Sequence, residues 1–296
     1  MIQSMRKAVF EWVTLLTALV IVGPFVGVPL AMLHSPSGSP EATSLTSTQP
    51  LLGIGFTLVA MVGALVAGWL GSKTVSRGMG MTAAGFVLVW AAARTGAGGM
   101  ILRDASSASG AALQMTIEAA ILAVPALLLV TLVHKVKPVE ADDSVYPLTE
   151  CRCGLLEGLR DAMTSRGIQI VLAAAAGAVF GSLFASIGMM KGQGLFAGFF
   201  AGLIGGAAGG LLLAGVENPR PALAPYIGVV LVMIAAPMAG SFYHGASLRT
   251  AAVTGELIGP ARLVPLDWIA GMLLGVPWGL SWLASSVKDK VETKRA

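Results

Sequence analysis

The sequence predicts an all-α polytopic membrane protein, a bundle of about eight transmembrane helices. Three observations support this fold class. Of the 296 residues, 55% are hydrophobic and only 11% are charged, whereas a soluble domain carries about 25% charged residues. The apolar residues gather in long runs, each close to the ~20 residues that a helix needs to cross a bilayer. The basic residues fall mostly on one side of the topology that these runs define.

The spans are expected in order along the chain. They lie at about residues 8–33, 51–71, 79–102, 112–134, 167–189, 194–215, 222–243 and 265–286. The first run has features of a signal peptide, because Arg6 and Lys7 precede it. Its length, the Glu11 inside it and the lack of a small-x-small cleavage site favour an uncleaved first span.

The positions of Lys and Arg predict that both termini are cytoplasmic. With the N-terminus inside, most basic residues fall in cytoplasmic segments, including the basic C-terminal tail. The outer segments contain only Arg103, Lys191, Arg249 and Arg262. We therefore expect an integral protein of a bacterial cytoplasmic membrane, with the lipid bilayer as its surroundings. No basic run is interleaved with aromatic residues, so we expect no nucleic-acid partner.

The longest inner connection divides the chain into a first transmembrane half (1–137), a cytoplasmic linker (138–165) and a second half (166–296). In the linker, apolar and charged side chains fall on opposite helical faces: Leu155, Leu156, Leu159 and Met163 against Glu157, Arg160 and Asp161. This pattern favours an amphipathic helix at the membrane interface, with a solvated linker as the alternative. Similar Leu-x-Val-Pro sequences in the fourth and eighth runs suggest a parallel 4+4 repeat, although composition alone gives the same similarity.

The sixth run contains the strongest packing pattern in the chain. Glycines recur in it every four residues, at Gly194, Gly198, Gly202, Gly206 and Gly210. Such a row lets two helix backbones approach closely in lipid, as in the GxxxG motif. We expect the bundle to pack tightly around this helix, and the same kind of face can join copies of the chain in a homo-oligomer.

Arg94 and Glu118 are the first candidate site. If the third and fourth runs are neighbouring helices, both residues lie roughly 9–13 Å below the same outer surface, at ~1.5 Å per residue. A lone charge at this depth costs at least ~2.5–3.5 kcal/mol, so a pair across the hairpin is expected. The pair either forms an ion or substrate relay or fixes the hairpin register; two side chains that snorkel outward are the third possibility.

The outer connection after the seventh run supplies the second candidate site. Its polar residues are His244, Arg249, Glu256 and Arg262, and Asp267 opens the last helix. The segment 255–260 is apolar and broken by Gly and Pro, which suits a re-entrant or lid segment that lines a cavity. Asp267 also has an ordinary explanation as a carboxylate near a helix N-terminus, and His244 as an interfacial residue. Cys151 and Cys153 are expected to be a reduced, inert pair rather than a metal or redox site.

The leading functional hypothesis is a transporter- or channel-like protein for a small solute or ion, with these two candidate sites as its polar lining. The alternative is a non-transporting subunit or scaffold of a membrane complex, in which the glycine face serves packing. A lipid-acting enzyme is the third hypothesis. No HExxH or GxSxG motif is present, so an enzyme is disfavoured, and no cofactor or metal is expected.

Overall fold

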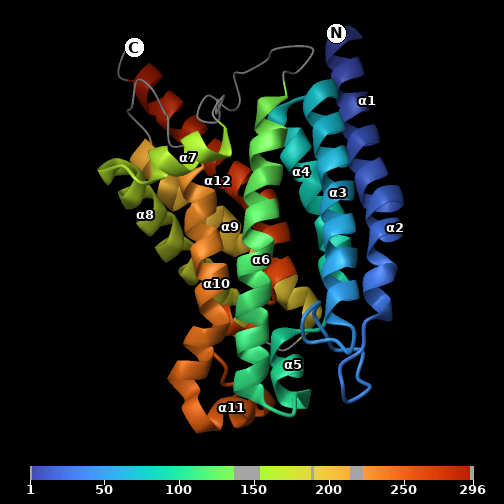
Figure 1. Ribbon diagram of the computed structural model, residues 1–296. Coiled ribbons are helices and arrows are strands. Elements are labelled where there is room, and N and C mark those ends of the chain that lie inside the picture. The colour runs from blue at the N-terminus through green and yellow to red at the C-terminus, as the bar shows by residue number, and fades with distance from the viewer. Residues whose placement is uncertain (1, 137–153, 188–189, 214–222, 294–296) are drawn as a thin grey trace.

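The computed structural model describes residues 2–136, 154–187, 190–213 and 223–293, and in this part of the chain the regular secondary structure is helical (Figure 1). Among the described residues, 7 segments are long and apolar enough to cross a membrane. They are Ala8–Met32, Pro50–Thr74, Arg77–Asp104, Ala108–Lys135, Ser165–Ala185, Lys191–Leu213 and Ala224–Thr254. The chain is therefore a multi-pass integral membrane protein, and seven of the expected spans coincide with segments that are long and apolar enough to cross.

The first span is a succession of helical turns rather than one α-helix. It comprises α1 (Ile2–Leu16), the π-helical η1 (Thr17–Val22), α2 (Gly23–Gly27) and the 3-10 turn η2 (Pro29–Met32). Its apolar side chains are largely exposed, as those of Val20, Ile21 and Phe25 show, and this suits contact with lipid. Residues 33–49 then form an irregular segment before α3 (Pro50–Thr74) runs back along the bundle.

The third span is broken, whereas the sequence predicts one continuous helix over 79–102. The helix α4 (Arg77–Ala93) ends at Arg94, and the short α5 (Gly98–Asp104) begins after a turn. The break is stabilised from elsewhere: Gly96 N donates to Ala42 O at 2.9 Å. A Cβ atom on Gly96 would lie 2.8 Å from Ala42 N, so only glycine allows the irregular segment to approach this closely.

The remaining helices complete the bundle. They are α6 (Ala108–Lys135), α7 (Leu155–Ala162), α8 (Ser165–Ser182), η5 (Leu183–Ile187), α9 (Lys191–Leu213), α10 (Ala224–His244), η6 (Gly245–Ser247), α11 (Leu248–Thr254), η7 (Gly259–Arg262) and α12 (Pro265–Thr293). The start of α1 and the end of α12 lie at one end of the bundle, whereas α5 and α11 lie at the other, called the far end below (Figure 1). The helix α7 lies across the end opposite to the far end (Figure 1).

The first part of α12, residues 265–277, is buried throughout, and α12 packs against α9, α4, α10 and α6. It lies outside the seven segments named above, although it coincides with the expected run at 265–286. Its contact with α9 joins two backbones. A Cβ atom on Gly206 would lie 2.5 Å from Val276 O, and one on Gly202 would overlap the Gly271 carbonyl group. Glycines of α12 face α9 in the same way at Gly271, Gly275 and Gly279.

Candidate functional site

The irregular segment 33–49 folds into the far end of the bundle, beside α3 and α6 (Figure 1). It is rich in hydroxyl groups, and several of them are buried: Thr43, Ser44, Thr46 and Ser47. Non-helical backbone at this depth is tolerated only when protein groups satisfy it, and here the hydroxyl groups do so. Ser47 Oγ donates to Ser44 O at 2.9 Å, and Ser44 Oγ lies 2.7 Å from Thr57 Oγ1 on α3.

Glu118 of α6 is fully buried beneath this segment, with 0% of its surface exposed. Its Oε2 accepts two hydrogen bonds, from Thr43 Oγ1 at 2.6 Å and from Leu45 N at 2.8 Å. Its Oε1 has no hydrogen-bond partner among the described residues. A carboxyl group is therefore held inside the membrane-spanning region by neutral donors alone, with Ser44 also close to it.

Thr43 and Thr46 form a short chain of hydrogen bonds that ends at Glu118. Thr43 N donates to Thr46 Oγ1 at 2.7 Å, and the two hydroxyl oxygens lie 3.1 Å apart. The hydroxyl hydrogen of Thr43 is directed to Glu118, so Thr46 is the donor between the two hydroxyls. Both donors then point toward the carboxyl group.

The expected pair between Arg94 and Glu118 is not formed. Arg94 terminates α4, and its guanidinium lies over the ring of Trp90, 5.8 Å from the centroid, which is a cation–π arrangement. The 33–49 segment satisfies Glu118 instead, and no ion pair joins the two residues in the described structure. The sequence placed the two residues at the same depth on adjacent helices, but it did not determine how each helix is rotated about its axis. The 33–49 segment, which contacts Glu118 instead, is distant from it in sequence.

A cavity of about 500 Å³ at the far end reaches this chain of hydrogen bonds; we call it the far-end cavity. Its wall is rich in hydroxyl groups and carries two carboxylates. The lining includes Ser35, Ser37, Glu41, Thr46, Ser47, Asp104, Ser106, Ser107 and Gln114. Gln114 precedes Glu118 by one helical turn, so the two side chains follow each other along one face of α6. The cavity thus ends at Thr46, two hydrogen bonds from Glu118.

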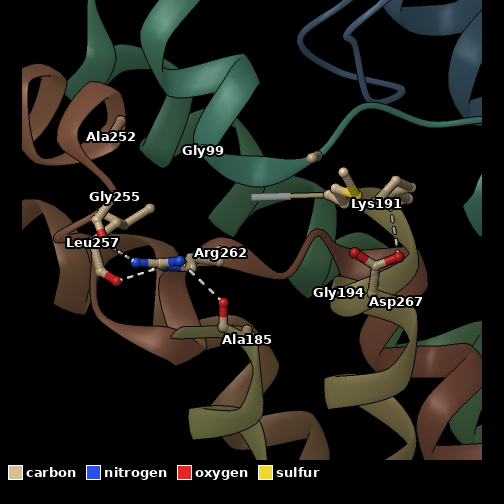
Figure 2. A pocket seen from close by; sticks show the side chains of 11 residues that line it. Gly99, Ala185, Lys191, Gly194, Ala252, Gly255, Leu257, Arg262 and Asp267 are labelled. Carbon is tan, nitrogen blue, oxygen red and sulfur yellow. Dashed lines mark hydrogen bonds and ion pairs between the residues drawn. The ribbon is translucent and has the colours of Figure 1, made fainter. Parts of the chain in front are cut away.

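A second, smaller cavity lies where the ends of several helices meet (Figure 2). Its volume is about 20 Å³, which is enough for roughly one water molecule. Beside it Lys191 Nζ forms an ion pair with Asp267 Oδ1 at 2.7 Å, drawn as a dashed line in Figure 2. Lys191 also donates to Thr95 Oγ1 at 3.1 Å and to Gly96 O at 3.2 Å. One ammonium group therefore ties α9 to α12 and to the break after α4.

Arg262 occupies the other side of the smaller cavity and holds the preceding segment in place (Figure 2). It is buried, and its guanidinium donates to Leu257 O at 2.7 Å, to Ala185 O at 3.1 Å and to Gly255 O. Burial lowers the pKa of Arg262 from its ordinary value. Asp267 Oδ2 accepts from Val264 N at 3.2 Å at the start of α12. Both residues therefore have clear structural roles at helix ends.

The other residues of the expected outer site are not among the residues that line either cavity. His244 ends α10 with its ring 4.9 Å from that of Tyr243, and Glu256 is exposed. Arg249 is exposed too and donates to Ala105 O and, at 2.8 Å, to Ser106 O, which joins α11 to the end of α5. Among the described residues, no group of three His, Cys, Asp or Glu is placed to hold a metal ion. The pair Cys151 and Cys153 lies outside the described residues.

The sequence interpretation missed Thr43, Thr46 and Lys191. A signal for the threonines was present: the connection between the first two spans reads Ala-Thr-Ser-Leu-Thr-Ser-Thr, which is short and rich in hydroxyl groups. Lys191 was used only to set the topology, although a single ammonium group before a long apolar helix needs a partner if it lies within the bundle.

Comparison with known proteins assigns no relationship: no family model, curated protein or solved structure matches the chain.

Proposed function

We propose that this protein is a transporter- or channel-like membrane protein for a small solute or ion, with Glu118 as its intramembrane binding group. The observation that carries the proposal is the state of this carboxyl group: fully buried, held by Thr43 and Leu45, and with Oε1 unpartnered. A charged side chain in a span costs at least ~2.5–3.5 kcal/mol and usually marks an ion or substrate pathway.

Access from the far end supports the same proposal. The far-end cavity brings a hydroxyl-lined volume of about 500 Å³ within two hydrogen bonds of Glu118. In the opposite direction α6 is packed into the apolar core, with Leu122, Ala126 and Val130 each fully buried. A path that is open on one side and packed on the other favours a transporter with alternating access over a permanently open channel.

The packing of α9 favours transport over a purely structural role in a complex. A scaffold would be expected to keep a long glycine face open for its partner. In this chain the two glycine faces of α9 are both covered from within: Gly202 lies against α12, whereas Gly205 lies against Ala174 of α8 and Val229 of α10. The non-transporting subunit remains the alternative hypothesis, which the flux experiment below tests.

The number of spans and the orientation of the chain in the membrane are part of the same proposal. With α12 counted as a span, eight helices cross the membrane and the two chain ends share one side, which the excess of basic residues makes the cytoplasmic side. The far-end cavity then opens outward. A parallel relationship between the two halves stays a prediction from the sequence.

The proposal is tested by flux measurements on purified protein in proteoliposomes. Rapid steps of protons, Na⁺, K⁺, amino acids, monosaccharides and polyamines are applied, and charge displacement is recorded on a solid-supported membrane. We expect at least one solute to produce a current in the wild type that falls at least tenfold in Glu118→Gln. Glu157→Gln, on the exposed side of α7, is the matched control and should behave as the wild type. Currents equal to those of protein-free liposomes for every solute would refute the proposal.

A further inference from the structure

We propose that Glu118 takes up protons from the far-end cavity through the hydroxyl groups of Thr46 and Thr43, so that the proton is the coupling ion of this protein. This inference rests on the proposed transport function and specifies its ion. It concerns a route of two side chains, between the wall of the far-end cavity and the buried carboxyl group.

The direction of the hydrogen bonds suits proton delivery to Glu118. Thr46 lines the far-end cavity and donates to Thr43, which donates to Glu118 Oε2. When a hydronium ion in the cavity gives a proton to Thr46 Oγ1, the Thr46 hydroxyl hydrogen passes to Thr43 Oγ1. The Thr43 hydrogen then passes to Glu118 Oε2. The net change is one proton from the cavity and one carboxylate converted to a carboxylic acid, with both hydroxyl groups restored and rotated.

The groups around Glu118 favour a proton over a metal cation. A metal cation in a protein is held by oxygen lone pairs. The neighbours of Oε2 are instead an N–H and an O–H group that direct hydrogens toward it, from Leu45 and Thr43. Such donors repel a cation, whereas they accommodate a carboxyl group in either protonation state. Once Oε2 carries the proton, it still accepts the bond from Leu45 N and itself donates to Thr43 Oγ1.

The charged groups on neighbouring elements have partners of their own or lie elsewhere. Glu41 accepts from Ala97 N at 2.9 Å, and Arg103 pairs with Asp104 at 2.7 Å. Among the described side chains, the charged or titratable groups on the other elements that pack against α6 are Lys73, Arg77, Glu157, Arg160, Asp161, Tyr226, Tyr243, His244, Arg249 and Asp267. Arg94 follows the end of α4, and His34 lies in the irregular segment. No ion pair joins any of these to Glu118 in the described part of the chain. Exchange with the cavity is therefore the route by which this carboxyl group gains or loses charge.

The test uses steps of pH on the full-length protein in proteoliposomes, without any solute. Proton uptake by a buried site displaces charge across part of the membrane, so the wild type should give a transient current when the outer pH falls. Glu118→Gln should abolish it, and Thr43→Val and Thr46→Val should reduce its rate at least tenfold. Thr43→Ser keeps the hydroxyl group and should restore the rate. The matched control is Thr131→Val, a buried threonine of α6 whose hydroxyl donates to Leu127 O of the same helix at 2.8 Å.

The outcomes separate this inference from the transport proposal. A proton current that persists in Glu118→Gln, or that Thr43→Val and Thr46→Val leave unchanged, overturns the proton route. A Na⁺ step that gives the current instead, together with Na⁺ protection of Glu118 against labelling by a carbodiimide, also overturns it, although the transport function then stands. If Thr43→Val does not fold, the Thr46→Val variant, which leaves the bond to Glu118 in place, decides the matter.

Discussion

The contact between α9 and α12 predicts that one methyl group at Gly202 will destabilise the protein. A Cβ atom there would overlap Gly271 O and would lie 2.9 Å from the Gly271 carbonyl carbon and 3.1 Å from Met272 Cα. The optimal separation is ~3.5–4.0 Å, so the two helices must move apart by roughly 0.5–1 Å. These neighbours are backbone atoms, and no side chain can rotate away to relieve the overlap.

The magnitude follows from the contacts that such a movement weakens. A gap of 0.5–1 Å forfeits a quarter to a half of each dispersion contact, and each is worth ~0.1–0.2 kcal/mol. Loss over several turns of the α9–α12 contact gives ~1–3 kcal/mol, the usual cost of overpacking. We therefore expect Gly202→Ala to lower the thermal unfolding midpoint in detergent by an amount on the order of 2–10 °C.

Tryptophan fluorescence is the assay, because Trp268 is buried on α12 within one turn of Gly271. The matched control is Gly55→Ala in α3, where an added Cβ atom meets nothing within 4 Å. This control should be neutral or slightly stabilising, since alanine favours a helix over glycine by up to ~1 kcal/mol. If Gly202→Ala proves as stable as Gly55→Ala, the α9–α12 contact described above is wrong.

Three further predictions concern charged side chains, each measured by the same unfolding assay. Lys191→Met leaves the carboxylate of Asp267 unpaired and should cost ~3–5 kcal/mol, whereas adding Asp267→Asn should recover part of the loss; equal stability of all three variants would argue against the ion pair. Arg262→Lys loses the planar fork that binds separate carbonyl groups and should cost ~1–3 kcal/mol, so an unchanged midpoint would contradict the role given to it. Arg94→Met and Glu118→Gln should be additive within ~0.5 kcal/mol in a double-mutant cycle, and a larger coupling would restore the direct pair.

The spans were predictable because their signal is local. Each requires only an apolar run of sufficient length, and seven of the expected runs coincide with segments that are long and apolar enough to cross a membrane. The break after Ala93 was not predictable in this way. Its free backbone groups are satisfied by residues distant in sequence, such as Ala42 and Lys191, and no property of residues 94–97 reveals those partners.

The candidate site shows the same division between local and distant information. The depth of Glu118 was readable from its position in a run, but its hydrogen-bond donors come from the connection between two other spans. That α12 packs against the α9 glycines could likewise not be predicted by considering each helix separately. A second row with the same period, at Gly271, Gly275 and Gly279, stood in the sequence of the last run and is the signal that could have found it.

The backbone contact between α9 and α12 also limits how this protein can change shape. A screw movement of α9 by a single residue, a rise of ~1.5 Å with a rotation of about 100°, would bring Phe199 or Leu203 to the positions that Gly198 and Gly202 occupy against α12. These side chains find no space there, so the register of the two helices is locked and the pair moves as one rigid unit. Any cycle that exposes Glu118 alternately to the two sides of the membrane must therefore be carried out by helices that meet through flexible side chains, among them α3 and α6. Spin labels on α9 and α12 should keep a constant separation throughout such a cycle, while labels on α6 should move relative to both.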